Sequence, residues 1–178
     1  AFYGPKIEVH VNDSLGRAWQ LGTIQVDFNI AEKFNLSFVN QDGKKEKPVV
    51  IHRAVFGSFE RFIGILVENY QGAFPVWLSP VQVKVLNLTD RNEKYAKKIS
   101  DELISQGIRT EIDNANETIG KKIRNAELEK IPYILVIGDK EEKSGAVAVR
   151  ERGKGNLGAE KIEKFKSRIL SEINKKSS

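Results

Sequence analysis

The chain has 178 residues, 40% of them apolar, and a formal net charge of +5, which fits one large globular domain or two small ones. No apolar run approaches the length of a membrane span, and the absence of cysteine excludes disulfide bonds and thiol chemistry. The absence of cysteine also fits a cytoplasmic protein. Methionine is missing even at position 1, so we expect a segment of a longer protein.

The positive charge lies entirely in the second half. Residues 1–80 carry 8 Lys/Arg against 8 Asp/Glu, whereas residues 81–178 carry 21 against 16. A basic half suits a partner that bears phosphates, although solubility alone produces similar values.

Residues 7–28 are predicted to form two antiparallel strands around a turn, because apolar and polar side chains alternate on both sides of an Asp-Ser-Leu-Gly signal. In a regular strand, Thr23 and Gln25 share one face and Gln20 lies on the other. So polar a strand is either an edge strand with one wet face or the floor of a polar pocket.

A helical turn is predicted at residues 31–34. An Asp-Gly bend at residues 42–43 predicts a hairpin, with strands at 36–39 and 47–51. The second of these strands is rich in β-branched residues, which favours a buried position.

Gly57 and Ser58 are predicted to end that strand and to cap a helix over residues 59–70, which carries one wide apolar stripe. Arg61 lies off the stripe in the first turn, where the helix dipole favours anions and not cations. It is therefore either a surface arginine paired with a neighbouring carboxylate or a residue kept for a ligand. Residues 76–80 are predicted to form a short packed connection.

From residue 81 the pattern alternates between strands and helices. The expected strands are 81–85, 108–113, 133–137 and 146–152, and the expected helices are 91–106, 118–129 and 159–174, with a turn at 139–145. Asp90 and Glu93 offer a capping arrangement for the first helix. This order predicts a three-layer α/β domain with a mixed sheet and right-handed crossovers.

The stretch Pro48–Val67, with its strand, histidine, Gly-Ser break and Glu-Arg pair, resembles motif 3 of the class II aminoacyl-tRNA synthetases, in the form found in threonyl-tRNA synthetases. Four other stretches resemble parts of the same catalytic domain: Phe2-Tyr3-Gly4-Pro5-Lys6 and residues 13–20, 22–28 and 74–83. Residues 116–124, 137–141 and 147–150 resemble the class II anticodon-binding domain.

The resemblance implies an α+β remnant of the class II antiparallel sheet with the motif 3 helix at 1–75, a linker at 76–80, and a three-layer α/β/α anticodon-binding domain at 81–178. It also implies that Arg61 and Lys6 are catalytic, with Arg61 on the γ-phosphate side of ATP, whose phosphates Mg²⁺ would accompany. A guanidinium suits this task because its planar fork matches phosphate oxygens. The other implied contacts are ATP and adenylate at Gln20, Thr23 and Gln25, and threonine at Tyr3 and Ser58.

His52 matches one of three zinc ligands, the other two of which would lie upstream of this chain. Zinc would hold the amino and hydroxyl groups of threonine and so reject valine. From the residues alone, a single histidine is more often an ordinary core or surface residue. His10 is the only other histidine, so the chain cannot assemble a complete zinc site from the usual ligands.

Asn116, Glu141 and Arg150 match positions that read anticodon bases. Amide, carboxylate and guanidinium groups suit the edges of splayed single-stranded bases. Without the resemblance, Asn116 would be a turn residue, and Glu141 and Arg150 a solvated pair.

The resemblance thus predicts part of an enzyme that activates threonine with ATP and transfers it to tRNA(Thr), as a homodimer in the full-length protein and without a membrane. Motifs 1 and 2 are missing from the 178 residues, so we expect the chain alone to be inactive. Two alternatives stay open: a stand-alone RNA-binding module without catalysis, and an α/β partner-binding domain without a role in RNA binding.

Overall fold

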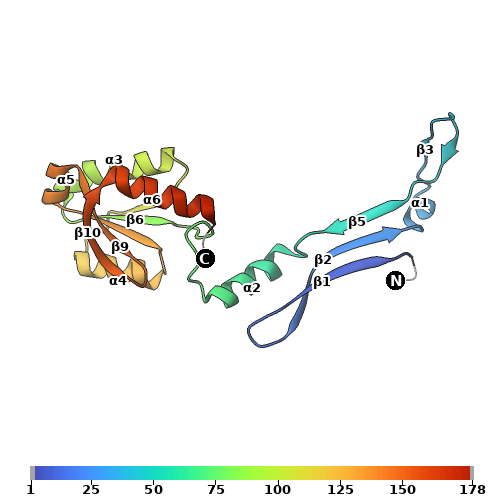
Figure 1. The fold of residues 1–178 in the computed structure, drawn as a ribbon, viewed down its shortest axis with the longest axis horizontal. Coiled ribbons are helices and arrows are strands. Elements are labelled where there is room, and N and C mark those ends of the chain that lie inside the picture. The colour runs from blue at the N-terminus through green and yellow to red at the C-terminus, as the bar shows by residue number, and fades with distance from the viewer. Residues whose placement is uncertain (1–2, 177–178) are drawn as a thin grey trace. The chain divides into compact units, whose positions relative to one another are not determined.

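The computed structural model describes residues 3–176, so Phe2 of the first matching stretch lies outside it. The chain divides into two compact units, Ala1–Gln71 and Gly72–Ser178, each with its own sheet (Figure 1). Within residues 3–176, no helix has both the length and the apolar character needed to cross a membrane.

A three-stranded antiparallel sheet, in the order β1-β2-β5, forms the centre of the first unit (Figure 1). β1 (Lys6–Asn12) and β2 (Ala18–Asp27) flank the predicted turn, and β5 (Val50–Ala54) pairs with the other edge of β2. α1 (Ile30–Lys33) follows β2.

The predicted hairpin with its bend at Asp42-Gly43 forms, but the assignment of residues 47–51 as its second strand was wrong. The hairpin closes earlier, between β3 (Phe38–Val39) and β4 (Lys45–Glu46), while β5 pairs with β2. The tip is tight because the Asn40 side chain accepts the backbone N–H groups of Asp42 and Lys44. The predicted burial of this stretch was also wrong: Val49 and Ile51 are 56% and 66% exposed, since β5 is an edge strand.

α2 (Phe59–Tyr70) begins and ends as predicted. The Ser58 hydroxyl accepts the Arg61 N–H at 3.2 Å, and Gln71 adopts the left-handed conformation at the other end.

The second unit is a five-stranded mixed sheet in the order β10-β9-β8-β6-β7. β6 (Val83–Asn87) pairs in parallel with β7 (Thr110–Asp113) and β8 (Tyr133–Ile137). β9 (Ala146–Glu151) and β10 (Gly155–Lys161) extend the β8 edge in antiparallel pairing. The helices are α3 (Glu93–Ser105), α4 (Ile119–Leu128), α5 (Asp139–Ser144) and α6 (Ile162–Lys175).

Two apolar clusters confirm the predicted three layers. Ile99 of α3 and Phe165 of α6 are buried on one face of the sheet, whereas Ala126 of α4 packs with Leu86 and Ile134 on the other. Figure 1 shows the same arrangement, with α3 and α6 above the sheet and α4 below it.

Three local predictions for this unit were wrong. β10 replaces the expected start of the last helix, and it forms in spite of Gly155 and Gly158 because an edge strand tolerates the bulge that they permit. Residues 139–145 form the short helix α5 instead of a turn. Asp90 caps no helix, since it starts a 3₁₀ turn, η1 (Asp90–Asn92), that leads into α3.

The division between the units falls before the segment 76–80 that the sequence marked as the linker. Val76 and Ser79 are buried within the second unit. Their carbonyl groups accept hydrogen bonds from Gln82 Nε2 at 2.8 Å and Arg109 Nε at 2.9 Å, respectively. This segment is therefore part of the second domain.

Candidate functional site

The pairing of the first sheet places several predicted site residues on one face. Lys6 lies opposite Gln25, and Gln25 lies opposite His52, so the three form one row across the sheet. Glu8 and Thr23 form the next row in register. Side chains of directly opposed residues, and of every second residue along a strand, point to the same face.

Gln20 joins this polar face through a β-bulge. The register steps from Val9 opposite Gly22 to His10 opposite Gln20, which leaves Leu21 as the extra residue on β2. The bulge reverses the alternation, and Gln20 Nε2 donates to Glu8 Oε1 at 2.6 Å. The prediction that Gln20 lies on the face opposite to Thr23 and Gln25 was therefore wrong.

Glu8 links two of the predicted residues and was missed by the sequence analysis. Its Oε1 accepts hydrogen bonds from Lys6 Nζ at 2.8 Å and from Gln20. The hydrogen bond from Lys6 lowers the pKa of the Glu8 carboxyl, and the same bond raises the pKa of Lys6. Strand alternation between Lys6 and Glu8 was the signal that could have identified it.

Arg61 makes none of the ion pairs formed within residues 3–176, which argues against the surface-pair alternative. Its Nη1 donates to the Gln20 carbonyl at 3.2 Å, and its guanidinium lies 5.8 Å from the centre of the Trp19 ring. The Ser58 cap fixes the backbone of the same turn. The guanidinium therefore has unused donors and a charge that no carboxylate of residues 3–176 neutralises.

Asp13 organises the turn that supports Trp19. Its carboxylate accepts Trp19 Nε1 at 2.8 Å, Arg17 Nε at 2.5 Å, and the backbone N–H groups of Leu15 and Arg17. Burial alone would raise the pKa of this carboxyl, but these hydrogen bonds lower it from 3.8 to about 2.

We predict that Asp13→Asn releases the Trp19 indole at neutral pH. Because the folded-state pKa lies below the ordinary value, ionised Asp13 stabilises the turn above about pH 4, and this contribution is lost as the pH falls through about 2. The NMR signal of the Trp19 indole N–H should therefore shift between these pH values in the wild type and be shifted at neutral pH in the variant. Asp42→Asn, in an exposed turn, is the control, and an unshifted indole signal in Asp13→Asn would refute the prediction.

Tyr3 precedes β1, and its carbonyl accepts the Phe28 N–H at 3.1 Å. The next residue must be small, because a Cβ at Gly4 would lie 2.1 Å from the Val26 carbonyl oxygen, and its φ is +153°. Gly4 thus lets the segment of Tyr3 and Pro5 lie close alongside the end of β2.

His52 is exposed on the polar face. Residues 3–176 contain no group of three His, Cys, Asp or Glu side chains that could hold a metal ion. The residues present therefore do not fit a complete zinc site.

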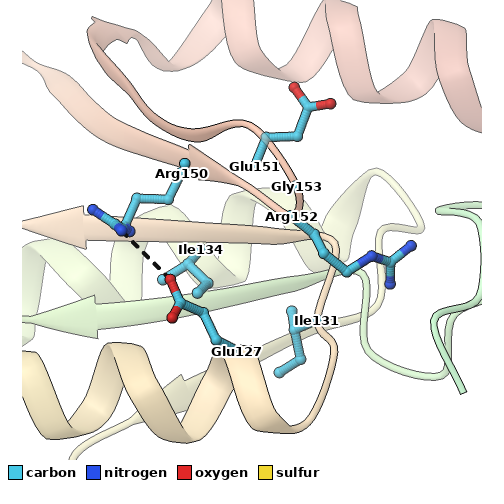
Figure 2. Close-up of a pocket in the computed structure, with 8 residues that line it drawn as sticks. Glu127, Ile131, Ile134, Arg150, Glu151, Arg152 and Gly153 are labelled. Atoms are coloured by element: carbon cyan, nitrogen blue, oxygen red, sulfur yellow. Dashed lines mark hydrogen bonds and ion pairs between the residues drawn. The ribbon is translucent and has the colours of Figure 1, made fainter.

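Arg150 lines a cavity of about 300 Å³ in the second unit (Figure 2). It lies on β9 opposite Ile134, on the sheet face that α4 covers in part. Its Nη2 lies 3.4 Å from Glu127 Oε1 of α4, and its Nε is buried without a partner. Figure 2 shows Arg150 and Glu127 reaching toward each other, with Ile131 and Ile134 beside them.

Asn116 and Glu141 lie away from Arg150. Both follow the carboxyl ends of parallel strands, Asn116 after β7 and Glu141 in α5 after β8. Arg150 lies opposite Ile134 of β8, four residues before Gly138, the residue that precedes α5. Four residues of a strand span about 13 Å, so Arg150 and α5 lie at different levels along β8. The predicted pair of Glu141 with Arg150 does not form, because Glu141 accepts the Gly138 N–H at 3.1 Å and Arg150 contacts Glu127.

The loop that carries Asn116 is held by a buried lysine that the sequence analysis did not single out. Lys122 is 3% exposed, and its Nζ donates to the Asp113 carbonyl at 3.0 Å and to Asn87 Oδ1 at 3.2 Å. It joins the ends of β6 and β7 immediately before this loop.

Two family profiles match the chain. Residues 82–172 match the anticodon binding domain, and residues 1–70 match the tRNA synthetase class II core domain (G, H, P, S and T).

Similar proteins span the whole chain. The threonine--tRNA ligase of Carboxydothermus hydrogenoformans is 56% identical over 176 residues, and that of Desulforamulus reducens is 59% identical over 177 residues. Each alignment covers 99% of this chain and 28% of the relative, so the chain spans about a quarter of their length. The crystal structure of the RNA binding domain of threonyl-tRNA synthetase from Cryptosporidium parvum Iowa II matches with a TM-score of 0.82 and 38% identity, over 97% of this chain and 44% of that one.

Proposed function

The chain belongs to the anticodon binding domain family, and from this premise we propose that it is the anticodon-reading part, with a share of the catalytic core, of a threonine–tRNA ligase. The observation that carries the proposal is the Arg150 cavity. It places two apolar side chains, Ile131 and Ile134, beside a partly exposed guanidinium whose one hydrogen bond within residues 3–176 is the 3.4 Å contact with Glu127. Such a combination suits an unpaired base, which offers acceptors on its edge and an apolar face.

The ligands of this unit are proposed to be the bases of the tRNA(Thr) anticodon. Arg150 reads one base, and Asn116 and Glu141 read bases nearer the carboxyl ends of β7 and β8. Their separation along the sheet suits several splayed bases instead of one. The excess of Lys and Arg in residues 81–178 supplies contacts to phosphates.

The first unit is proposed to supply part of the adenylation site. Arg61 is proposed to neutralise the phosphates of ATP, which Mg²⁺ accompanies, and Lys6 is proposed to be the second catalytic residue. The polar face carries the residues proposed to meet nucleotide and adenylate, which are Gln20, Thr23 and Gln25. Tyr3 and Ser58 are proposed to line the threonine pocket.

His52 is proposed to be one zinc ligand on this polar face, with the other ligands coming from outside the 178 residues. Zinc would supply the site that binds the amino and hydroxyl groups of threonine. The parent ligase is proposed to act in the cytoplasm as a homodimer.

We expect no threonyl-tRNA from this chain alone with threonine, ATP and tRNA(Thr). Its sequence contains motif 3 but neither motif 1 nor motif 2, so positioning and charge neutralisation at the α-phosphate are incomplete. A parallel reaction with a full-length threonine–tRNA ligase provides the positive control, and turnover by the chain itself would contradict the proposal.

Binding of the chain to the anticodon stem-loop of tRNA(Thr), across a salt series, tests the anticodon-reading role. A loop with its second and third anticodon bases changed is the comparison. Preference for the native loop that persists at moderate salt supports anticodon reading, whereas equal and steeply salt-dependent binding would indicate only a basic surface.

The second candidate is a stand-alone RNA-binding module without catalysis. It is favoured by the confinement of the net positive charge to residues 81–178. Reconstitution separates the two: activity regained by adding the remainder of a ligase would favour the enzyme.

A further inference from the structure

A carboxylate stands beside the guanidinium that is proposed to read a base. Glu127 lies near the end of α4 and lines the same cavity as Arg150, and its Oε1 is 3.4 Å from Arg150 Nη2 (Figure 2). The Glu127 side chain is 55% exposed and that of Arg150 is 28% exposed. This ion pair is long and partly exposed to solvent, so an incoming ligand can replace Glu127 as the partner of Arg150.

An arginine without such a neighbour would be a poor base reader. RNA presents a phosphate at every nucleotide, and a guanidinium fork binds phosphate oxygens at least as readily as a base edge. An anionic carboxylate at the same cavity repels phosphate, which offers only acceptors and negative charge. A base edge differs, because it offers N–H donors beside its acceptors.

We propose that Glu127 is a specificity-determining residue of the Arg150 cavity. Its negative charge repels backbone phosphates from Arg150. Its carboxylate also accepts an N–H group of one unpaired nucleobase, while an acceptor of the same base binds Arg150. Within residues 3–176 the only hydrogen bond of this guanidinium runs from Nη2 to Glu127, so the partly exposed guanidinium retains Nη1 as a donor for that base even while Glu127 is in place. This inference rests on the proposed anticodon-reading function and adds the residue that excludes the competing phosphate.

The chain offers a matched control for the charge itself. Glu129, two residues further at the end of the same helix, is 52% exposed and pairs with Lys84 at 2.8 Å. Glu127→Gln and Glu129→Gln each remove one negative charge from the carboxyl end of α4, so both change the net charge that attracts RNA by the same amount. Only Glu127→Gln changes the neighbourhood of Arg150.

The experiment measures Kd for the native anticodon stem-loop and for the base-changed loop, with the wild type and both variants, over a salt series. We expect Glu127→Gln to bind the base-changed loop more tightly and to lose about tenfold in the ratio of the two Kd values, with a steeper salt dependence. Glu129→Gln should strengthen binding to both loops and leave their ratio at the wild-type value.

Two other results would overturn the proposal, and they differ from each other. If the wild type prefers the native loop and Glu127→Gln keeps the same ratio, anticodon reading stands and the role of Glu127 fails. If the wild type shows no preference, the anticodon-reading function fails, and the role of Glu127 fails with it.

Discussion

Replacement of Arg150 by alanine should abolish the preference of the chain for the native anticodon loop. A bidentate contact between arginine and a base edge supplies about 1–3 kcal/mol of discrimination, which is roughly a tenfold to hundredfold ratio of Kd values. Within residues 3–176 Arg150 makes only the long contact with Glu127, which leaves donors for a base, and Ile131 and Ile134 line the same cavity. The one ion pair that Arg150 forms with the described residues, the pair with Glu127, is partly exposed, so the substitution should leave the fold intact.

Arg124→Ala is the matched control for this experiment. Arg124 is an exposed residue of α4, the helix that also carries Glu127. A phosphate-binding arginine should weaken both loops equally and reduce the slope of log Kd against log salt by about one. Fluorescence anisotropy with labelled loops measures both quantities. Equal weakening of both loops by Arg150→Ala would show that Arg150 is only another phosphate contact.

The sequence predicted part of the polar face, placing Thr23 and Gln25 together, but it missed Glu8 and put Gln20 on the other face. Alternation along β2 assigns Gln20 to the wrong face, because the bulge at Leu21 adds one residue without a turn signal. The register that aligns Lys6, Gln25 and His52 joins positions 19 and 27 residues apart in the chain. The turn signal at residues 13–16 indicates the first of these pairings, but local patterns carry no information about the pairing of β2 with β5.

The Arg150 cavity shows the same limit in the second unit. The helix that carries Glu127 and the strand that carries Arg150 were both predicted, with bounds close to those observed. The two residues meet because the sheet order is β9-β8-β6. α4 packs on β6 and β8, so Glu127 near its end reaches Arg150 on the neighbouring strand β9. Glu127 therefore looked like one more exposed glutamate. β10 was missed because Gly155 and Gly158 argue against a strand by propensity alone.

The two units should also differ greatly in stability, and hydrogen exchange should show it. Amides of β6, β8 and β9 should exchange at least about 1,000-fold more slowly than those of β1, β2 and β5, which corresponds to about 4 kcal/mol. The second unit buries complete side chains such as Val85, Leu135 and Phe165, each 0% exposed. Among the described residues of the first unit, only Leu21 and Ala31 are buried apolar side chains.

Backbone pairing alone cannot compensate for this difference. Ile7 and Ile51 are 67% and 66% exposed, and Phe59 at the start of α2 is 76% exposed. Each exposed apolar side chain forgoes about 1.5–3 kcal/mol of transfer free energy that burial would supply. Three antiparallel strands without a covered apolar face have little independent stability.

Mass spectrometry of peptides from the two units in one exchange experiment supplies its own internal control, since both experience the same pH and temperature. Phe165→Ala should lower protection of the β6, β8 and β9 peptides by about 3–5 kcal/mol and leave the β1 and β2 peptides unchanged. Exchange of β2 as slow as that of β8 would mean that the first sheet is stabilised by something other than apolar burial. If the expected contrast is found, the polar face that carries Lys6, Gln25 and His52 is not held rigidly by this chain alone, and a catalytic site that depends on fixed positions needs the rest of the class II core.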